Sequence, residues 1–358
     1  MLYHLLFPLS DAFAPFNVFR YITFRAAGAA VTALLLSLLV GPWFIETLRR
    51  YQLGQTIRAE GPETHLGKAG TPTMGGLLIL TSLLVPTLLW ARLTNPYVWL
   101  AVGVTVAFGF IGFLDDALKI RHRRNLGLTA RVKLGLQILA GGMTGAALLA
   151  LPGFESTLTF PFFKELVLSL GLFYVPFAVL VLVGTSNAVN LTDGLDGLAI
   201  GATLIAAATY AVFTYLAGNV VLGGYLQVAL IPGVGEVTIF CAALAGASLG
   251  FLWFNCHPAE VFMGDVGSLS LGAAIGAVAL LAKQELLLVL VGGLFVLEAL
   301  SVILQVGSFK LTGRRVFRMA PLHHHFELVG WPEAKVIVRF WILSVLFALL
   351  SLSTLKLR

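Results

Sequence analysis

The chain has 358 residues, of which 58% are hydrophobic and only 11% are charged, and its mean hydropathy is +0.94. This composition excludes a soluble enzyme with an ordinary core and is typical of a polytopic membrane protein, here with one domain over residues 1–358. The formal net charge is +6. The basic residues are distributed as membrane topology requires, so we expect no nucleic-acid partner.

Long apolar runs predict an all-α fold. A helix needs about 20 apolar residues to cross a bilayer, and ten segments meet this criterion. Pairs of glycines four residues apart, typical of helix packing, occur at Gly141/Gly145, Gly246/Gly250 and Gly272/Gly276. The predicted transmembrane helices are 21–48, 73–92, 96–114, 130–151, 167–184, 192–216, 236–253, 266–282, 286–309 and 336–356.

The basic residues orient this bundle. Loops 49–71, 115–135 and 310–339 hold most of the 23 Lys and Arg, and with ten helices all three lie on one side. The positive-inside rule makes that side cytoplasmic and places both termini on the periplasmic side. On the periplasmic side, segment 152–166 is expected to form a short hairpin or a surface helix.

The most polar stretch in the hydrophobic sequence reads Asn-Ala-Val-Asn-Leu-Thr-Asp-Gly-Leu-Asp-Gly. Its Asn187, Asn190, Asp193 and Asp196 are three residues apart, so they share one broad face of a helical turn. We expect a polar ridge at the start of a membrane helix, which Thr192 or Asp193 caps. Polar groups at this depth are costly and usually functional. The ridge therefore predicts a site for a cation, for phosphates or for both.

Carboxylates and amides gather on the same side of the membrane. Asp115 and Asp116 end one predicted helix, while Asn255 and Asp265 lie before another. Asp265 stands between two glycines at a helix start, where it is either a plain N-cap or a ligand. A hard divalent cation takes oxygen ligands from several elements. Asp265 together with Asp115, Asp116 or Asp193 therefore predicts a metal site.

The third polar cluster is the run His323-His324-His325. Consecutive histidines do not easily reach one zinc ion, whose sites favour wider spacing. Imidazolium groups beside Arg314 and Arg315 are better suited to bind phosphate oxygens.

Three classes of protein fit these clusters. A transporter would place its polar groups near the bilayer midplane, whereas these lie at one face, as in an enzyme of the membrane surface. An intramembrane aspartyl protease would use a Gly-x-Gly-Asp motif, but here Phe262 replaces the first glycine. We therefore favour the membrane-surface enzyme.

Four motifs, in the same order, are similar to those of one family. They are Gly-Phe-Leu-Asp-Asp, the Asn/Asp stretch, Phe-Met-Gly-Asp-Val-Gly-Ser and Met-Ala-Pro-Leu-His-His-His-Phe-Glu. The chain resembles the phospho-N-acetylmuramoyl-pentapeptide transferases, a branch of the polyprenyl-phosphate N-acetylhexosamine-1-phosphate transferases. The resemblance runs from Phe16 almost to the C-terminus.

The resemblance implies ten transmembrane helices, a homodimer, a cytoplasmic Mg²⁺ site and a multi-pass location in the bacterial inner membrane. It implies that UDP-N-acetylmuramoyl-pentapeptide and undecaprenyl phosphate give lipid I and UMP in peptidoglycan synthesis. Within the superfamily, a transferase of N-acetylglucosamine 1-phosphate is the alternative. A transporter of an anionic lipid or nucleotide is the alternative from another class.

The resemblance also assigns roles to residues. Phe262 stacks on uracil, and the sugar or the phosphates contact Lys133, Gln305, His323 and His324. Independently of the resemblance, two mechanisms compete: an Asp attacks the UDP-sugar and forms a phospho-enzyme, or the lipid phosphate attacks directly. A phosphate monoester is largely ionised at neutral pH, so we favour direct attack, with Asp115 orienting the lipid phosphate or taking its last proton. The expected catalytic residues are Asp115, Asp116, Asp265 and His323, and the nucleoside pocket is expected to involve Lys68, Asn187, Leu195 and Asp196, with Asn190, Asp193 and Asn255 also binding substrate.

Overall fold

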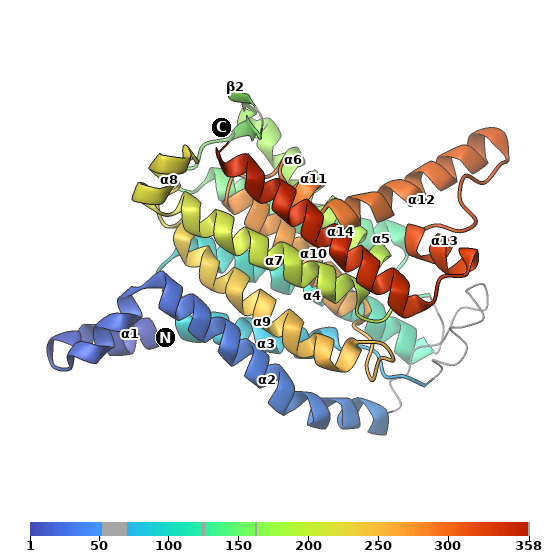
Figure 1. Cartoon of the computed structure of the whole chain (residues 1–358), viewed down its shortest axis with the longest axis horizontal. Coiled ribbons are helices and arrows are strands. Elements are labelled where there is room, and N and C mark those ends of the chain that lie inside the picture. The colour runs from blue at the N-terminus through green and yellow to red at the C-terminus, as the bar shows by residue number, and fades with distance from the viewer. Residues whose placement is uncertain (52–69, 123–125, 162, 357–358) are drawn as a thin grey trace.

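The computed structural model describes residues 1–51, 70–122, 126–161 and 163–356. Apart from one short hairpin, its elements are helices packed side by side in a bundle (Figure 1). Within the described residues, nine helices are long and apolar enough to cross a membrane, which confirms the polytopic all-α fold. They are α2 (Ile22–Arg50), α4 (Pro96–His122), α5 (Ala130–Leu149), α6 (Tyr174–Thr192), α7 (Leu198–Ala217), α9 (Val237–Asn255), α10 (Gly264–Leu281), α12 (Gly293–Thr312) and α14 (Glu333–Ser353).

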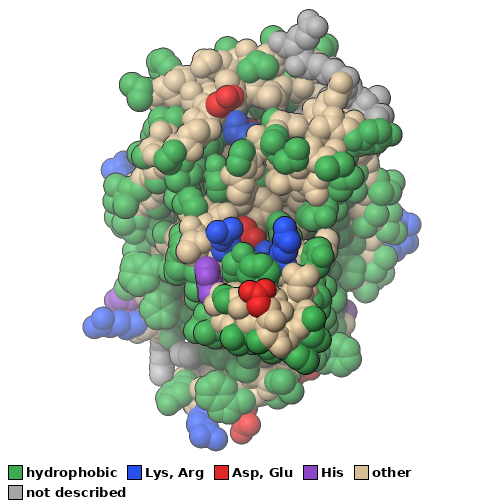
Figure 2. Space-filling model, turned by 90° about the vertical axis from the view of Figure 1, so that its left-hand side faces the viewer, with side chains coloured by type: hydrophobic (Ala, Val, Ile, Leu, Met, Phe, Trp, Pro, Cys, Tyr) green, Lys and Arg blue, Asp and Glu red, His purple; other side chains and the backbone are tan. Residues whose placement is uncertain are grey.

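The one predicted transmembrane helix that is missing from these nine is 73–92, where the structure has a shorter helix. Helix α3 covers Gly76–Trp90, 15 residues, and at 1.5 Å per residue it is about 22 Å long. Both termini lie at one end of the bundle, and α13 (Leu322–Val329) lies at the other (Figure 1). Figure 2 shows the end with the termini, where charged side chains are few. Which side of the membrane each end faces stays a prediction.

The segment before α6 differs from the prediction. Strand β1 (Thr157–Phe160) pairs antiparallel with β2 (Phe163–Ser169), with Leu158 opposite Leu168. The expected hairpin is therefore present, but a helix beginning at 167 was wrong. The run Leu166-Val167-Leu168 is short and apolar, and periodicity alone does not separate such a strand from the start of a helix.

The predicted helix 286–309 is also divided. A short helix α11 (Leu288–Val291) ends at Gly292, and α12 begins at Gly293. Two successive glycines weaken a helix because they gain the most backbone freedom on unfolding. The remaining short helices are α1 (Leu2–Leu6) and α8 (Val220–Leu226), with 3₁₀ turns at Phe7–Asp11, Ala14–Arg20, Gly171–Phe173, Val234–Glu236 and Thr354–Lys356.

Helix α10 is the centre of the bundle and is buried along nearly its whole length. It packs against α3, α4, α6 and α7. The predicted glycine pairs lie at helix contacts: a Cβ on Gly272 would stand 2.5 Å from the Thr185 carbonyl oxygen, and one on Gly246 would stand 2.1 Å from that of Ala30. These positions let α10 approach α6 and α9 approach α2, as the spacing predicted.

A buried ion pair lies at the end of the bundle where the termini are found. Arg25 of α2 donates to both carboxylate oxygens of Glu236, at 2.7 and 2.6 Å. The backbone N–H of Arg92 donates to the same carboxylate at 3.0 Å. Because this bidentate pair is shielded from water, each partner compensates a charge that would otherwise be buried alone.

The substitution Glu236→Gln should therefore lower the stability of the protein by about 3 kcal/mol, because it leaves the Arg25 guanidinium without its counter-ion. Thermal unfolding of the purified protein in detergent measures this effect. Glu46→Gln is the matched control, since Glu46 and Arg50 form an exposed pair at 3.8 Å, and exposed pairs contribute little. Equal unfolding temperatures for the two variants would refute a stabilising role for the buried pair.

Candidate active site

Three carboxylates meet at the end of the bundle opposite the termini. Asp115 and Asp116 lie near the C-terminal end of α4, and Asp265 lies in the first turn of α10. One oxygen atom from each lies within 4.8 Å of the others. This confirms that the Asp pair and the lone Asp of the sequence motifs come together in space.

Each carboxylate has one oxygen held by an N–H group of the protein. Asp115 Oδ1 accepts from the backbone of Leu128 at 2.9 Å, and Asp116 Oδ2 accepts from the backbone of Val266 at 3.0 Å. Asp265 Oδ1 accepts from the Asn190 side chain at 2.8 Å. These bonds fix the orientation of all three groups, so their second oxygens point into a common space.

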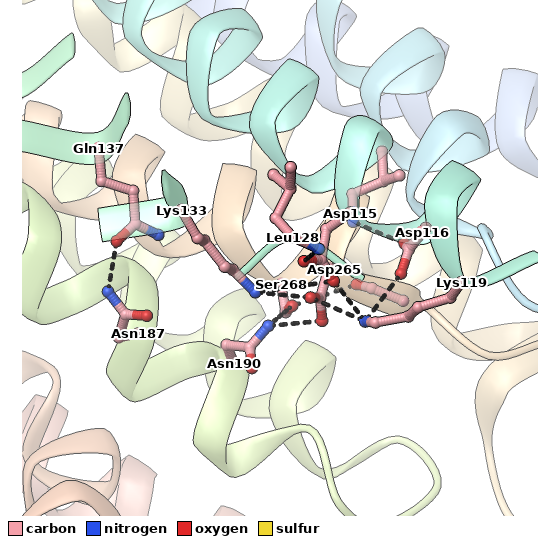
Figure 3. A network of polar contacts seen from close by, with 12 residues as sticks. Asp115, Asp116, Lys119, Leu128, Lys133, Gln137, Asn187, Asn190, Asp265 and Ser268 are labelled. Atoms are coloured by element: carbon pink, nitrogen blue, oxygen red, sulfur yellow. Dashed lines mark hydrogen bonds and ion pairs between the residues drawn. The ribbon is translucent and has the colours of Figure 1, made fainter. Parts of the chain in front are cut away.

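Two lysines face these second oxygens (Figure 3). Lys119 Nζ lies 2.6 Å from Asp115, 3.3 Å from Asp116 and 3.0 Å from Asp265. Lys133 Nζ lies 2.6 Å from Asp265 and 4.0 Å from Asp115. Lys133 was expected at the site, whereas Lys119 was missed. Its spacing of three and four residues from the Asp pair on one helix was the signal that could have identified it.

The predicted polar ridge does not begin a helix. Asn187 and Asn190 lie in the last turns of α6, and Asp193 follows that helix. Thr192 donates its hydroxyl to the Ala188 carbonyl, and α7 starts after Gly197 without a side-chain cap. The predicted cap was therefore wrong. The chain turns at Gly197 with a φ of +77°, a conformation that glycine adopts at little cost.

The side chains of the ridge do not all point to the same place. Asn190 donates to Asp265 and, at 2.9 Å, to Ser268, while Asn187 donates to Gln137 of α5 at 2.9 Å. Asp193 is half-buried, and burial raises its pKa to about 8, with the neighbouring Asp265 and Asp116 carboxylates acting in the same direction. The part of this rise that comes from Asp265 and Asp116 reflects negative charge crowded at this point, which a bound cation would offset.

Asp196 points to a separate cluster. Its carboxylate lies 3.2 Å from His257 Nδ1, and Glu333 Oε2 lies 3.5 Å from the same nitrogen. Asn255 lies beside it: its oxygen accepts from the Gly197 N–H and its amide donates to the Val261 carbonyl. These contacts tie the turn after α6 to the loop before α10.

Three further candidates lie on α12 and α13. His323 is fully buried, with Nδ1 3.2 Å from Glu298, and a Cβ on Gly194 would meet its Nε2 at 2.2 Å. His324 contacts Glu327 at 2.8 Å, and Gln305 holds the backbone of Phe317. Glu298 was missed, although a carboxylate within a predicted span is itself a signal of function.

The remaining candidates have different surroundings. Leu195 is buried. Phe262 is half-buried, and its backbone bonds to Pro72 and Gly75 join this loop to the start of α3. Lys68 lies outside the described residues.

The donor set at the carboxylate trio fits a hard divalent cation. Its atoms are all carboxylate oxygens from two helices, without sulfur or imidazole, and such oxygens suit Mg²⁺, Ca²⁺ or Mn²⁺. Asp115, Asp116 and Asp265 could therefore hold a metal. Together with two ammonium groups they form a site suited to bind and align anionic groups such as phosphates.

Known proteins resemble this chain over its full length. Residues 98–283 match glycosyl transferase family 4, and residues 68–80 match the phospho-N-acetylmuramoyl-pentapeptide-transferase signature 1. The phospho-N-acetylmuramoyl-pentapeptide-transferase of Citrifermentans bemidjiense is 57% identical over 358 residues, and that of Desulforapulum autotrophicum is 59% identical over 359 residues, each covering 100% of both chains. The chain therefore belongs to the phospho-N-acetylmuramoyl-pentapeptide-transferase family.

Proposed function

We propose that this chain transfers phospho-N-acetylmuramoyl-pentapeptide from its UDP derivative to undecaprenyl phosphate, giving lipid I and UMP in the bacterial cell membrane. The observation that carries the proposal is the cluster of carboxylates and lysines (Figure 3), which lies where α4 ends and α10 begins in a membrane-spanning bundle. One substrate is a water-soluble anion and the other is a lipid, so their phosphates meet only at the membrane surface. The names of the full-length relatives support the same reaction.

We further propose that the cation is Mg²⁺, held by Asp265 with Asp115 and Asp116, and with Asp193 close by. When bound, it would neutralise charge on the phosphate oxygens. Phosphoryl transfer depends on alignment and charge neutralisation more than on covalent chemistry. Asn190 contributes alignment, since its bond fixes Asp265, and Lys133 contributes positive charge at the same carboxylate.

Direct attack by the lipid phosphate is favoured over a phospho-enzyme. A phosphate monoester has a second pKa near 6, so it is largely ionised at neutral pH and needs no strong base. Both oxygens of Asp115 are already engaged, one by the Leu128 N–H and the other by Lys119. This supports Asp115 as an orienting group and not as the nucleophile. Trapping of a covalent phospho-aspartate would reverse this assignment.

The nucleoside and sugar contacts are proposed from the family resemblance. Asn187 lies near the end of α6, and Leu195 and Asp196 lie in the turn that follows. Asn255 ends α9 and accepts from the Gly197 N–H of that turn, and Phe262 lies in the loop between α9 and α10. We assign these residues to the nucleotide; Lys68, which the family resemblance also assigns to it, lies outside the described residues. Gln305 lies on α12, and His323 and His324 lie on α13. We assign these three residues to the sugar and the phosphates. The homodimer stays a prediction.

Purified protein should release UMP from UDP-N-acetylmuramoyl-pentapeptide only when undecaprenyl phosphate and Mg²⁺ are both present. Addition of EDTA should reduce release to background, and excess Mg²⁺ should restore it, because the carboxylate trio otherwise lacks its divalent counter-ion. Release from UDP-N-acetylglucosamine instead would favour the other branch of the superfamily. Movement of substrate across a vesicle membrane without UMP would favour a transporter.

A further inference from the structure

Lys119 occupies the point on which the carboxylate trio converges. The outer oxygens of Asp115, Asp116 and Asp265 are bonded to protein N–H groups. Their other oxygens all face the Lys119 ammonium, at 2.6, 3.3 and 3.0 Å. A Mg²⁺ ion needs its oxygen ligands at about 2.0–2.1 Å. An ammonium group that contacts the same three oxygens fills the position the cation requires.

The balance of charge points the same way. Three carboxylates facing the two ammonium groups of Lys119 and Lys133 leave one negative charge. A divalent cation added to this arrangement would give an excess positive charge beside a second cation. A divalent cation that replaces Lys119 and leaves Lys133 in place gives neutrality. Exchange is therefore electrostatically better than addition.

Lys119 is held less firmly than the carboxylates, each of which accepts a hydrogen bond from a protein N–H group. It lies on α4 one turn beyond Asp115, and its side chain is 30% exposed, so the amine has an outward path. Within the described residues, the partners of its ammonium are the three carboxylates. Lysine side chains have four rotatable bonds and reorganise readily.

We propose that Lys119 is an internal placeholder for the metal: its ammonium closes the carboxylate trio until a divalent cation displaces it, and the displaced amine then binds a phosphate oxygen of the substrate. This inference rests on the proposed metal-dependent transfer. Lys119 then has two opposing effects: its side chain lowers the affinity for the metal and raises the rate of phosphoryl transfer.

The first test is metal affinity without substrate. Mn²⁺ binding to the purified protein is measured by electron paramagnetic resonance for wild type, Lys119→Met, Asp265→Asn and Arg121→Met. Lys119→Met should bind Mn²⁺ about tenfold more tightly, the factor expected if the site is open one time in ten in the wild type. Arg121 is exposed on the same helix, so Arg121→Met removes an equal charge and should leave the affinity within about twofold. The turnover of Lys119→Met should fall although its metal binding improves.

The second test follows the displaced amine in the wild-type protein. Reductive methylation of Lys119, measured by peptide mass spectrometry, should rise severalfold when Mg²⁺ is added. Methylation of the exposed Lys310 should stay constant and serves as the internal reference. This measurement requires no variant, so it decides the question even if Lys119→Met does not fold.

The outcomes separate the two proposals. If neither the wild type nor Asp265→Asn binds Mn²⁺, the metal assignment in the proposed function fails. If the wild type binds but Lys119→Met binds no more tightly, the placeholder is overturned and the metal site stands. If Lys119→Met binds Mn²⁺ more tightly but Mg²⁺ does not raise the methylation of Lys119 in the wild type, the placeholder is also overturned. The Lys119 charge would then weaken metal binding without the amine leaving its position.

Discussion

Replacement of Asp265 by Asn should lower the rate of UMP release by about a thousandfold, the upper range for loss of one electrostatic element of a transition-state site. Asp265 is the residue on which the other contacts meet: Lys119, Lys133 and Asn190 all bond its carboxylate. An amide has the same shape but lacks the charge. The substitution therefore weakens cation binding at this site, and Lys119 and Lys133 lose the carboxylate that they share.

Initial rates at saturating lipid and UDP-sugar measure this effect, and thermal unfolding confirms that the variant is folded. Glu46→Gln is the control, because Glu46 is an exposed carboxylate on α2 and should keep the wild-type rate. Wild-type turnover in Asp265→Asn would move the essential carboxylate to Asp115, Asp116 or Asp193. Loss of turnover that is fully restored by higher Mg²⁺ would limit Asp265 to metal affinity.

Sequence reasoning identified the site mainly through topology. The positions of Asp115, Asp116 and Asp265 at helix ends, with the loop charges, placed them on one side of the bundle, and the structure brings them together. Which other groups join them depends on side-chain direction. Lys119 was missed because it fell in the predicted loop 115–135, whose basic residues were explained by membrane orientation alone. In the structure α4 continues through this position, and Lys119 lies one turn beyond Asp115.

The turn after α6 shows a second limit. The spacing of Asn187, Asn190, Asp193 and Asp196 predicted one continuous face, which holds only while the helix continues. The helix ends at Thr192, and Asp196 consequently turns to His257 and not to Asp265. The end is determined by tertiary contacts, such as the bond from the Gly197 N–H to Asn255, 58 residues away. Local periodicity does not contain that information.

Gly112→Ala should reduce the rate of UMP release by about a hundredfold while the chain keeps all its polar residues. Gly112 lies on α4 three residues before Asp115, where α4 contacts the start of α10. An added Cβ would stand 2.1 Å from the Asp265 carbonyl oxygen and 2.4 Å from its carbonyl carbon. Both obstructing atoms are backbone, so no side-chain rotation relieves the overlap, and the two helices must separate by about 1 Å.

That separation moves Asp115 and Asp116 away from Asp265, because the pair is carried by one helix and the single carboxylate by the other. A displacement of about 1 Å at a reacting centre costs about a hundredfold in rate, and the affinity for Mn²⁺ should fall with it. Gly103→Ala is the matched control. Gly103 lies on the same helix, α4, and a Cβ added there would meet nothing within 4 Å. A Gly112→Ala protein with the activity and metal affinity of Gly103→Ala would show that the trio tolerates helix separation. A joint loss of activity and metal affinity in Gly112→Ala alone would show that the contact between α4 and α10 aligns the three carboxylates.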